Sequence, residues 1–166
     1  MFGGSLTVMA QTSPTFPGTQ RNDPNLPENQ NAPHREMIKE LEIRREEGEY
    51  KQHVARAKEN AQLAVELRET FTHEKNLQAP DIKKLSRMEK LSRQIRSEAG
   101  GEEVKNDAKD SPPPPQPEEA FRRLAELTAD LQKKVEKTPR QVVSAAVINR
   151  ANEIIELLKY IHTLYR

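Results

Sequence analysis

The sequence has no cysteine and no tryptophan, and apolar residues make up only 34% of its 166 residues. The absence of cysteine excludes disulfide bonds and thiolate metal sites, so thiol usage says nothing about the redox compartment. No run of about 18 apolar residues occurs, and the sequence therefore predicts no membrane-spanning helix. Because globular domains usually contain roughly 45 to 50% apolar residues, one large hydrophobic core is not expected either.

An excess of charge of one sign is also lacking. The chain has 27 Lys and Arg against 26 Asp and Glu, although charged residues together reach 32% of the total. Such a balance is typical of solvated helix faces and not of a basic domain that binds nucleic acid. A charged surface for a partner must therefore be sought in one part of the chain.

The residue patterns of common catalytic and metal sites are missing as well. No glycine-rich phosphate loop or nucleophile elbow occurs, and adjacent glutamates such as Glu46 and Glu47 would point apart on a helix. The four histidines lie in separate segments, whereas a zinc site on a helix needs two of them three or four residues apart. They are His34, His53, His73 and His162. We interpret them as solvated surface residues, and we expect no enzyme, no catalytic or metal-binding residue, no cofactor and no small-molecule substrate.

Prolines divide the chain into segments of different character. Five of the twelve lie between residues 14 and 33, and five lie between residues 112 and 117. Residues 11–33 are rich in Asn, Gln, Thr and Pro, and residues 98–117 are acidic and then proline-rich. Residues 1–33 and 98–117 are therefore expected to be disordered. Between them we expect two helical regions, residues 34–97 and residues 118–166.

The first ten residues admit two interpretations. Phe2 to Ala10 is uncharged and mildly apolar, and Val8-Met9-Ala10 has the small-x-small pattern that signal peptidases accept. If this is the remnant of a signal peptide, the protein is periplasmic or secreted. If Met1 is the true start, it is cytoplasmic.

Apolar residues at helical spacing predict an all-α fold built from one helical hairpin that occurs twice. The copies are residues 54–97 and 120–165, and Leu63 to Leu67 aligns with Leu127 to Leu131. A capping serine, Ser144, is preferred over the competing start at Thr138 for the last helix. Each hairpin exposes an apolar stripe, so we expect a four-helix bundle or coiled-coil-like pairs with another chain.

The strongest periodic pattern lies in the last helix. Its apolar positions are spaced alternately by four and three residues, as in a coiled coil. They are Val147, Ala151, Ile154, Leu158, Ile161 and Tyr165. We expect this association seam to drive self-association or to bind a protein partner. By contrast, the part of the first helix before Tyr50 is expected to be helical but exposed, because its short partner helix cannot cover it.

Residues 81–97 form an amphipathic helix with a basic face opposite its apolar stripe. The basic residues are Lys83, Lys84, Arg87, Lys90, Arg93 and Arg96. Such a face solvates a bundle helix, or it binds an anionic membrane or polymer surface. Nucleic acid is the less favoured partner because this face has no aromatic residue for base stacking.

The second hairpin resembles uncharacterised bacterial exported helical-hairpin proteins. Their pattern is L-x-x-E-L-K-x-x-V-D-K-T, a loop, and S-x-x-V-x-K-A-E-E-I-E-K-L-A-K. Here residues 127–138 read LTADLQKKVEKT and residues 144–159 read SAAVINRANEIIELLK. The chain departs from the pattern at Ile148, Asn152 and Ile155, where the pattern prefers charge. The resemblance implies export to the cell envelope and a helical hairpin, and together these observations predict a non-catalytic interaction protein.

Overall fold

A computed structural model of the chain describes residues 32–102, 116–139 and 142–165. Most of the two segments expected to be disordered, 1–33 and 98–117, lies outside the described residues. At the edges of these segments, Pro33, Glu98 and Pro117 belong to helices. The linker expected between the hairpins is therefore shorter at both ends than the sequence predicted.

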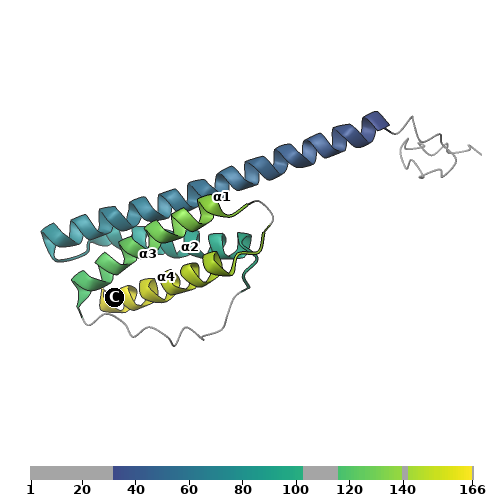
Figure 1. Cartoon of the computed structure of the whole chain (residues 1–166). Coiled ribbons are helices and arrows are strands. Elements are labelled where there is room, and N and C mark those ends of the chain that lie inside the picture. The colour runs from purple at the N-terminus through teal and green to yellow at the C-terminus, as the bar shows by residue number, and fades with distance from the viewer. Residues whose placement is uncertain (1–31, 103–115, 140–141, 166) are drawn as a thin grey trace, which may run out of the picture. The chain divides into compact units, whose positions relative to one another are not determined.

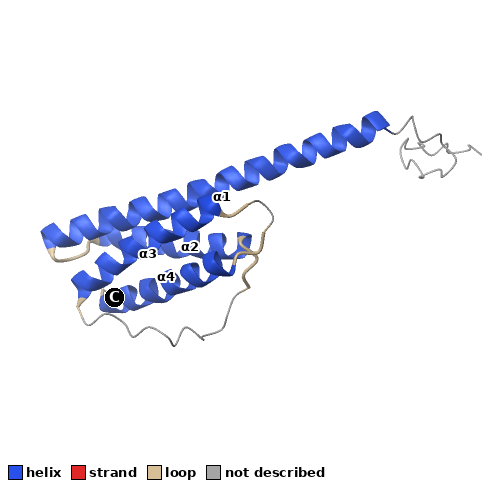
Figure 2. Cartoon of the chain, viewed as in Figure 1, coloured by secondary structure: helices blue, strands red, loops and turns tan. Residues whose placement is uncertain are grey.

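Helices account for nearly all of the described residues, which confirms the all-α prediction (Figures 1 and 2). They are α1 (Ala32–Glu74), α2 (Ala79–Glu98), α3 (Pro117–Lys137) and α4 (Ala145–Leu164). No strand occurs in this part of the chain. The chain divides into two compact units, residues 1–39 and 40–166. The described part of the first unit is the start of α1, and the second unit holds the rest of α1 with the other three helices.

The ends of α2 follow from local sequence. At its start, the backbone N–H of Gln78 donates to the Asp81 carboxylate at 3.1 Å, in the reciprocal arrangement of a capping box. At its end, Gly100 has a positive φ of 85° and Gly101 donates its N–H to the Arg96 carbonyl at 2.9 Å. This Schellman motif satisfies carbonyls that the last turn leaves free.

The connection between α3 and α4 follows the expected boundaries. Thr138 lies just past the end of α3, and its hydroxyl donates to the Lys134 carbonyl at 2.8 Å, so it ends one helix and does not start the next. Ser144 caps α4, because its hydroxyl accepts from the N–H of Val147 at 3.4 Å. Within the first helical region, α1 continues to Glu74, and Lys75 then takes a positive φ of 55°.

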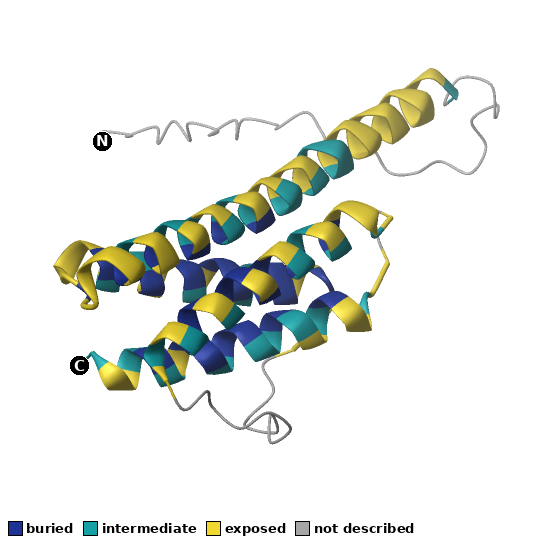
Figure 3. Cartoon of the chain, turned by 60° about the vertical axis from the view of Figure 1, so that its left-hand side comes forward, coloured by how far each residue is buried: buried dark blue, intermediate teal, exposed yellow. Residues whose placement is uncertain are grey.

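In the second unit, the four helices form a bundle in which every neighbouring pair is antiparallel. α4 packs against both α2 and α3. α1 also contacts α2 and α3, through the Asn60–Ser92 hydrogen bond and through the Phe71 and Phe121 rings, whose centroids are 4.7 Å apart. The buried residues lie on the facing sides of these helices, as the colouring of the ribbon in Figure 3 shows. Each hairpin therefore buries the apolar stripe of the other.

The burial pattern supports the internal repeat. Buried positions 57, 60, 64, 67 and 71 of α1 recur 64 residues later in α3, at 121, 124, 128, 131 and 135. Those at 85, 88, 91, 92 and 95 of α2 recur 66 residues later in α4, at 151, 154, 157, 158 and 161. The same helix faces are thus used in both hairpins, although the side chains differ. Among the buried positions of α1, Asn60 is the polar one, and the apolar pattern of the sequence did not indicate its burial.

Candidate functional site

The association seam of α4 lies inside the bundle of its own chain. Five of its six residues have no exposed surface, and Tyr165 is partly covered by the rings of Phe71 and Phe121 at centroid distances of 6.1 and 6.3 Å. Burial raises the pKa of the Tyr165 phenol, with a smaller contribution from Tyr160. Binding of a second chain through this seam would require the bundle to open, and it stays a prediction.

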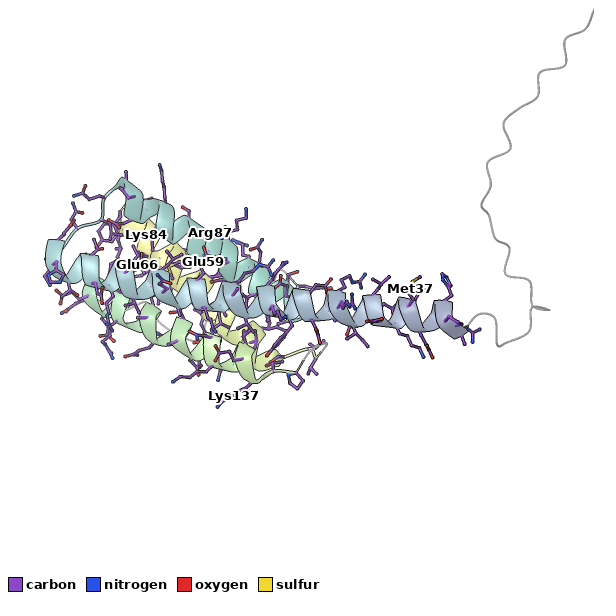
Figure 4. The ribbon with its side chains drawn as sticks, turned by 90° about the horizontal axis from the view of Figure 1, so that it is seen from above. Met37, Glu59, Glu66, Lys84, Arg87 and Lys137 are labelled. Carbon is purple, nitrogen blue, oxygen red and sulfur yellow. The ribbon has the colours of Figure 1, made fainter. Side chains whose placement is uncertain are left out.

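The basic face of α2 is largely neutralised by acidic residues. Arg87 forms a bidentate ion pair with Glu59 of α1, at 2.8 and 3.0 Å, and Lys84 lies 3.3 Å from Glu66 (Figure 4). The hydrogen bond from Arg87 lowers the pKa of Glu59 against the opposing effect of burial. Within α2 itself, Arg93 pairs with Glu89 at 2.8 Å. The expected surplus of positive charge is therefore much reduced.

Arg96 is not on this exposed face. It is 93% buried between α2 and α4, because only 7% of its surface is exposed, and its Nη1 donates to the Asn152 side chain at 3.1 Å. Its Nε has no hydrogen-bond partner among the described residues. Of the six basic residues, Lys83 and Lys90 are exposed without a carboxylate partner among the described residues. A hollow of about 410 Å³ beside Lys90 is lined by side chains of α2 alone.

A groove of about 520 Å³ lies between the middle of α1, the end of α2 and the connection from α3 to α4. Its lining comprises Arg45, Glu46, Glu49, Tyr50, Gln52, His53, Arg56, Glu98, Ala99, Thr138, Pro139, Val142, Ser144 and Val147. The Tyr50 hydroxyl donates to the Glu136 carbonyl at 3.1 Å. The Ser144 N–H donates to the Ala99 carbonyl at 3.2 Å and so joins the end of α2 to the start of α4.

The chemistry of this groove centres on Glu98. One carboxylate oxygen accepts from Arg56, and the other lies 2.6 Å from Nδ1 of His53. Only 15% of the His53 side chain is exposed, so its interpretation as a solvated surface residue was wrong. The Ser144 hydroxyl in the same groove caps α4. These groups pair with one another and tie α1 to α2, and the described residues include no nucleophile hydrogen-bonded to His53.

The described part of the chain has no cluster of side chains suited to bind a metal ion. No group of three or more His, Asp or Glu side chains lies close enough to hold an ion there. His73 is exposed near the end of α1, and Nε2 of His162 lies 3.4 Å from the Ser86 hydroxyl. Among the described helices, none is long and apolar enough to cross a membrane.

The first half of α1 is the most exposed apolar surface of the described residues. Half of the exposed large apolar side chains lie within seven consecutive residues, namely Met37, Ile38, Leu41 and Ile43. Met37, Leu41 and Ile43 are each more than half exposed. Figure 3 shows this part of the helix as a nearly continuous exposed surface. Its exposure was expected from the sequence, but no functional role was predicted for it.

Comparison of the chain with protein-family models, curated proteins and solved structures gave no match. The sequence also failed to indicate the His53–Glu98–Arg56 cluster, because Glu98 lies 45 residues from His53 and 42 residues from Arg56 along the chain. The ion pairs between α1 and α2 could have been predicted, because basic residues outnumber acidic ones in α2. Glutamates of α1 at positions 59 and 66 could have been recognised as their partners once the antiparallel hairpin was aligned.

Proposed function

We propose that the protein is a non-catalytic helical interaction protein whose contact surface is the first half of α1. The single observation that carries this proposal is the cluster of exposed apolar side chains from Met37 to Ile43. Clustered apolar exposure on a chain that has few apolar residues is typical of a binding surface. The bundle supports this role because it anchors α1 through the buried residues from Ala57 to Phe71.

A stabilising role for the polar groove fits the same proposal. In the groove, Glu98 is shared between His53 and Arg56, and the Ser144 hydroxyl is committed to a helix cap. Groups that already satisfy one another are poorly placed to act on a substrate, because catalysis needs convergent groups free to react. Export to the cell envelope, which the resemblance of the second hairpin implies, stays a prediction.

The alternative function is peripheral binding to an anionic membrane or polymer through α2. The exposed lysines at 83 and 90 favour it, whereas the ion pairs of Lys84 and Arg87 weaken it. Binding to vesicles that contain phosphatidylserine should be weak and fall steeply with salt. A Lys83→Gln, Lys90→Gln variant that binds these vesicles as well as the unaltered chain would eliminate this alternative.

Site-specific photocrosslinking tests the proposed contact surface. A photoreactive phenylalanine analogue replaces Leu41 in the full chain, and in a matched control it replaces the exposed Glu69 of the same helix. In expressing cells, position 41 should form a discrete adduct with a protein, and the adduct should disappear when Ile38 is also changed to Glu. If positions 41 and 69 give the same products, the first half of α1 is not a contact surface.

A further inference from the structure

The first half of α1 carries a heptad pattern separate from the one that faces the bundle. Ile38 and Leu41 occupy its a and d positions, and Arg45 and Gly48 occupy the next a and d. Ile38, Leu41 and Arg45 are exposed. Positions that face the bundle, such as Tyr50 and Val54, are half-buried. The apolar residues of the pattern, Ile38 and Leu41, are therefore uncovered, whereas Arg45 and Glu49 also line the groove beside α1.

The charges beside this seam have a fixed order. The e positions hold Glu42 and Glu49, and the g positions hold Arg44 and Lys51. In a parallel coiled coil each g residue faces an e residue of the other chain five positions later, which places Arg44 against the partner's Glu49. In an antiparallel coil g faces g and e faces e, so like charges meet. Within residues 34–49 the charges are self-complementary only in the parallel orientation. Beyond them, Lys51 would face Arg56 of the second copy, so the complementary stretch ends at residue 49.

The ion pairs within α1 do not prevent contact with a second chain along this seam. Arg44 bonds to Glu40 at 2.6 Å, and Arg45 lies 3.4 Å from Glu49. All four of these side chains are more than 60% exposed. Exposed pairs spaced by four residues contribute little to stability, so their side chains are free to reorient toward a second chain.

Contact with a partner would also stabilise the first half of α1. Residues 33 to 45 bury no side chain, and isolated helices of about 12 to 15 residues are marginal in water. Gly48 further weakens the helix interior. A Cβ at Gly48 would have no atom within 4 Å, which leaves room for a neighbouring helix to approach closely.

From these observations we infer that a second copy of this chain binds along residues 34–49 of α1 as a short, parallel, in-register coiled coil. The inference rests on the proposed contact surface and specifies its partner. Ile38 and Leu41 supply two apolar layers, Gly48 permits close approach, and the pair formed by Arg44 and the partner's Glu49 sets the orientation. With only two apolar layers the dimer is weak and forms at high protein concentration.

Disulfide crosslinking tests the partner and the orientation together. The chain has no cysteine, so Leu41→Cys and Gly48→Cys each introduce the only thiol. In a parallel in-register dimer, both variants should crosslink under mild oxidation in the full chain. The exposed control Glu69→Cys should not. In an antiparallel dimer at most one of the two positions meets its own copy, so crosslinking of one alone would overturn the parallel arrangement. Rates equal to the control at both positions would overturn the dimer.

Charge and size variants provide a test that does not depend on thiols. Arg44→Glu should weaken the dimer about fivefold in sedimentation equilibrium, and the added change Glu49→Arg should restore it. Gly48→Leu adds an apolar d residue in open space and should tighten the dimer by about tenfold or more. A leucine placed at Glu69 is the control for non-specific association. A dimer strengthened by Arg44→Glu would contradict the parallel pairing.

Different results would contradict the contact surface on α1 and the second copy as its partner. A photocrosslink from position 41 to a protein other than this chain, without thiol crosslinking at positions 41 and 48, would leave the contact surface in place and eliminate the second copy. Products from position 41 that match those of the Glu69 control would remove the contact surface itself.

Discussion

Gly100 is the residue whose backbone most clearly requires glycine. Its φ of 85° lies in the left-handed region, and a Cβ there would approach Cγ2 of Val143 to 2.9 Å. Gly100→Ala should lower the free energy of unfolding by about 1 to 2 kcal/mol, mainly through backbone strain because the exposed Val143 side chain can move. Urea titration measures the loss. Gly48→Ala, with open space and no positive φ, is the matched control and should not destabilise the protein.

Asn60 and Ser92 form a polar pair in an otherwise apolar seam. Both are fully buried, Asn60 donates to the Ser92 hydroxyl at 2.9 Å, and the amide oxygen of Asn60 has no partner among the described residues. The corresponding residues of the second hairpin are Leu124 and Leu158. A single polar residue in a seam fixes the register of two helices at a cost in stability, and we assign that role to Asn60.

Replacing both members of the pair tests this role. The combined change Asn60→Leu, Ser92→Ala should raise the free energy of unfolding by about 1 to 2 kcal/mol, because no buried polar group is left unpaired. Ser92→Ala alone should lower the free energy of unfolding by about 1 to 3 kcal/mol. The change removes the acceptor and leaves the buried Asn60 amide without a hydrogen-bond partner. Chemical denaturation measures both. A double variant less stable than the single one would contradict this account of the pair.

At the residue level the sequence predicted most buried apolar positions but not the polar ones. Spacing alone placed Val147, Ile154 and Leu158 on one apolar helix face, and they are buried. Asn60 was missed because an apolar pattern has no place for an amide, although the repeat aligns it with Leu124. The pairing of His53 with Glu98 could not be foreseen, because it depends on the end of α2 returning to the middle of α1.

At the scale of elements, one ion pair joins α3 to α4. Asp130 accepts from Arg150 at 2.7 Å and also lies 3.2 Å from Lys134. Burial alone would raise the pKa of Asp130, but the hydrogen bonds and charges of Lys134 and Arg150 lower it overall. A carboxylate with a lowered folded pKa stabilises the protein above its ordinary pKa of about 4, and this contribution is lost as the pH falls through the folded value.

The variant Asp130→Asn should therefore be less stable than the unaltered chain at neutral pH and equally stable in acid. The neutral-pH difference should be only about 0.5 to 1 kcal/mol, because the Asp130 side chain is 38% exposed and solvent screens the pair. Denaturant titrations at neutral pH and below the folded pKa measure the change. Salt at about 1 M should shrink the neutral-pH difference. A difference that persists unchanged in acid would mean that the charge is not responsible.

Helix boundaries were predictable where a local signal marks them. Ser144 was expected to cap the last helix, and α4 begins at the next residue, Ala145. The second helical region was expected from residue 118, and α3 begins at Pro117. At the end of α1, Thr72 bonds its hydroxyl to the Arg68 carbonyl and stays helical. The basic face of α2 was overestimated for a different reason, since its neutralising glutamates belong to another helix.

At the scale of the whole molecule, the bundle is held by contacts between two equivalent hairpins. α4 of the second hairpin packs against α2 of the first, and the rings of Phe71, Phe121 and Tyr165 join both hairpins at one end. Each hairpin alone would expose an apolar stripe that its own two helices cannot cover. The hairpins should therefore fold together and depend on each other for order.

Separate expression of residues 1–102 and 116–166 tests this dependence. Each fragment alone should show reduced helicity, and an equimolar mixture should gain circular dichroism at 222 nm beyond the sum of the two spectra. The mixture should contain a one-to-one complex in sedimentation experiments. Leu158→Asp in the second fragment should abolish the gain, because a charge would replace a side chain with no exposed surface at the seam. Spectra that add without any gain would show that the two hairpins fold independently, and the contacts between them would then contribute little to stability.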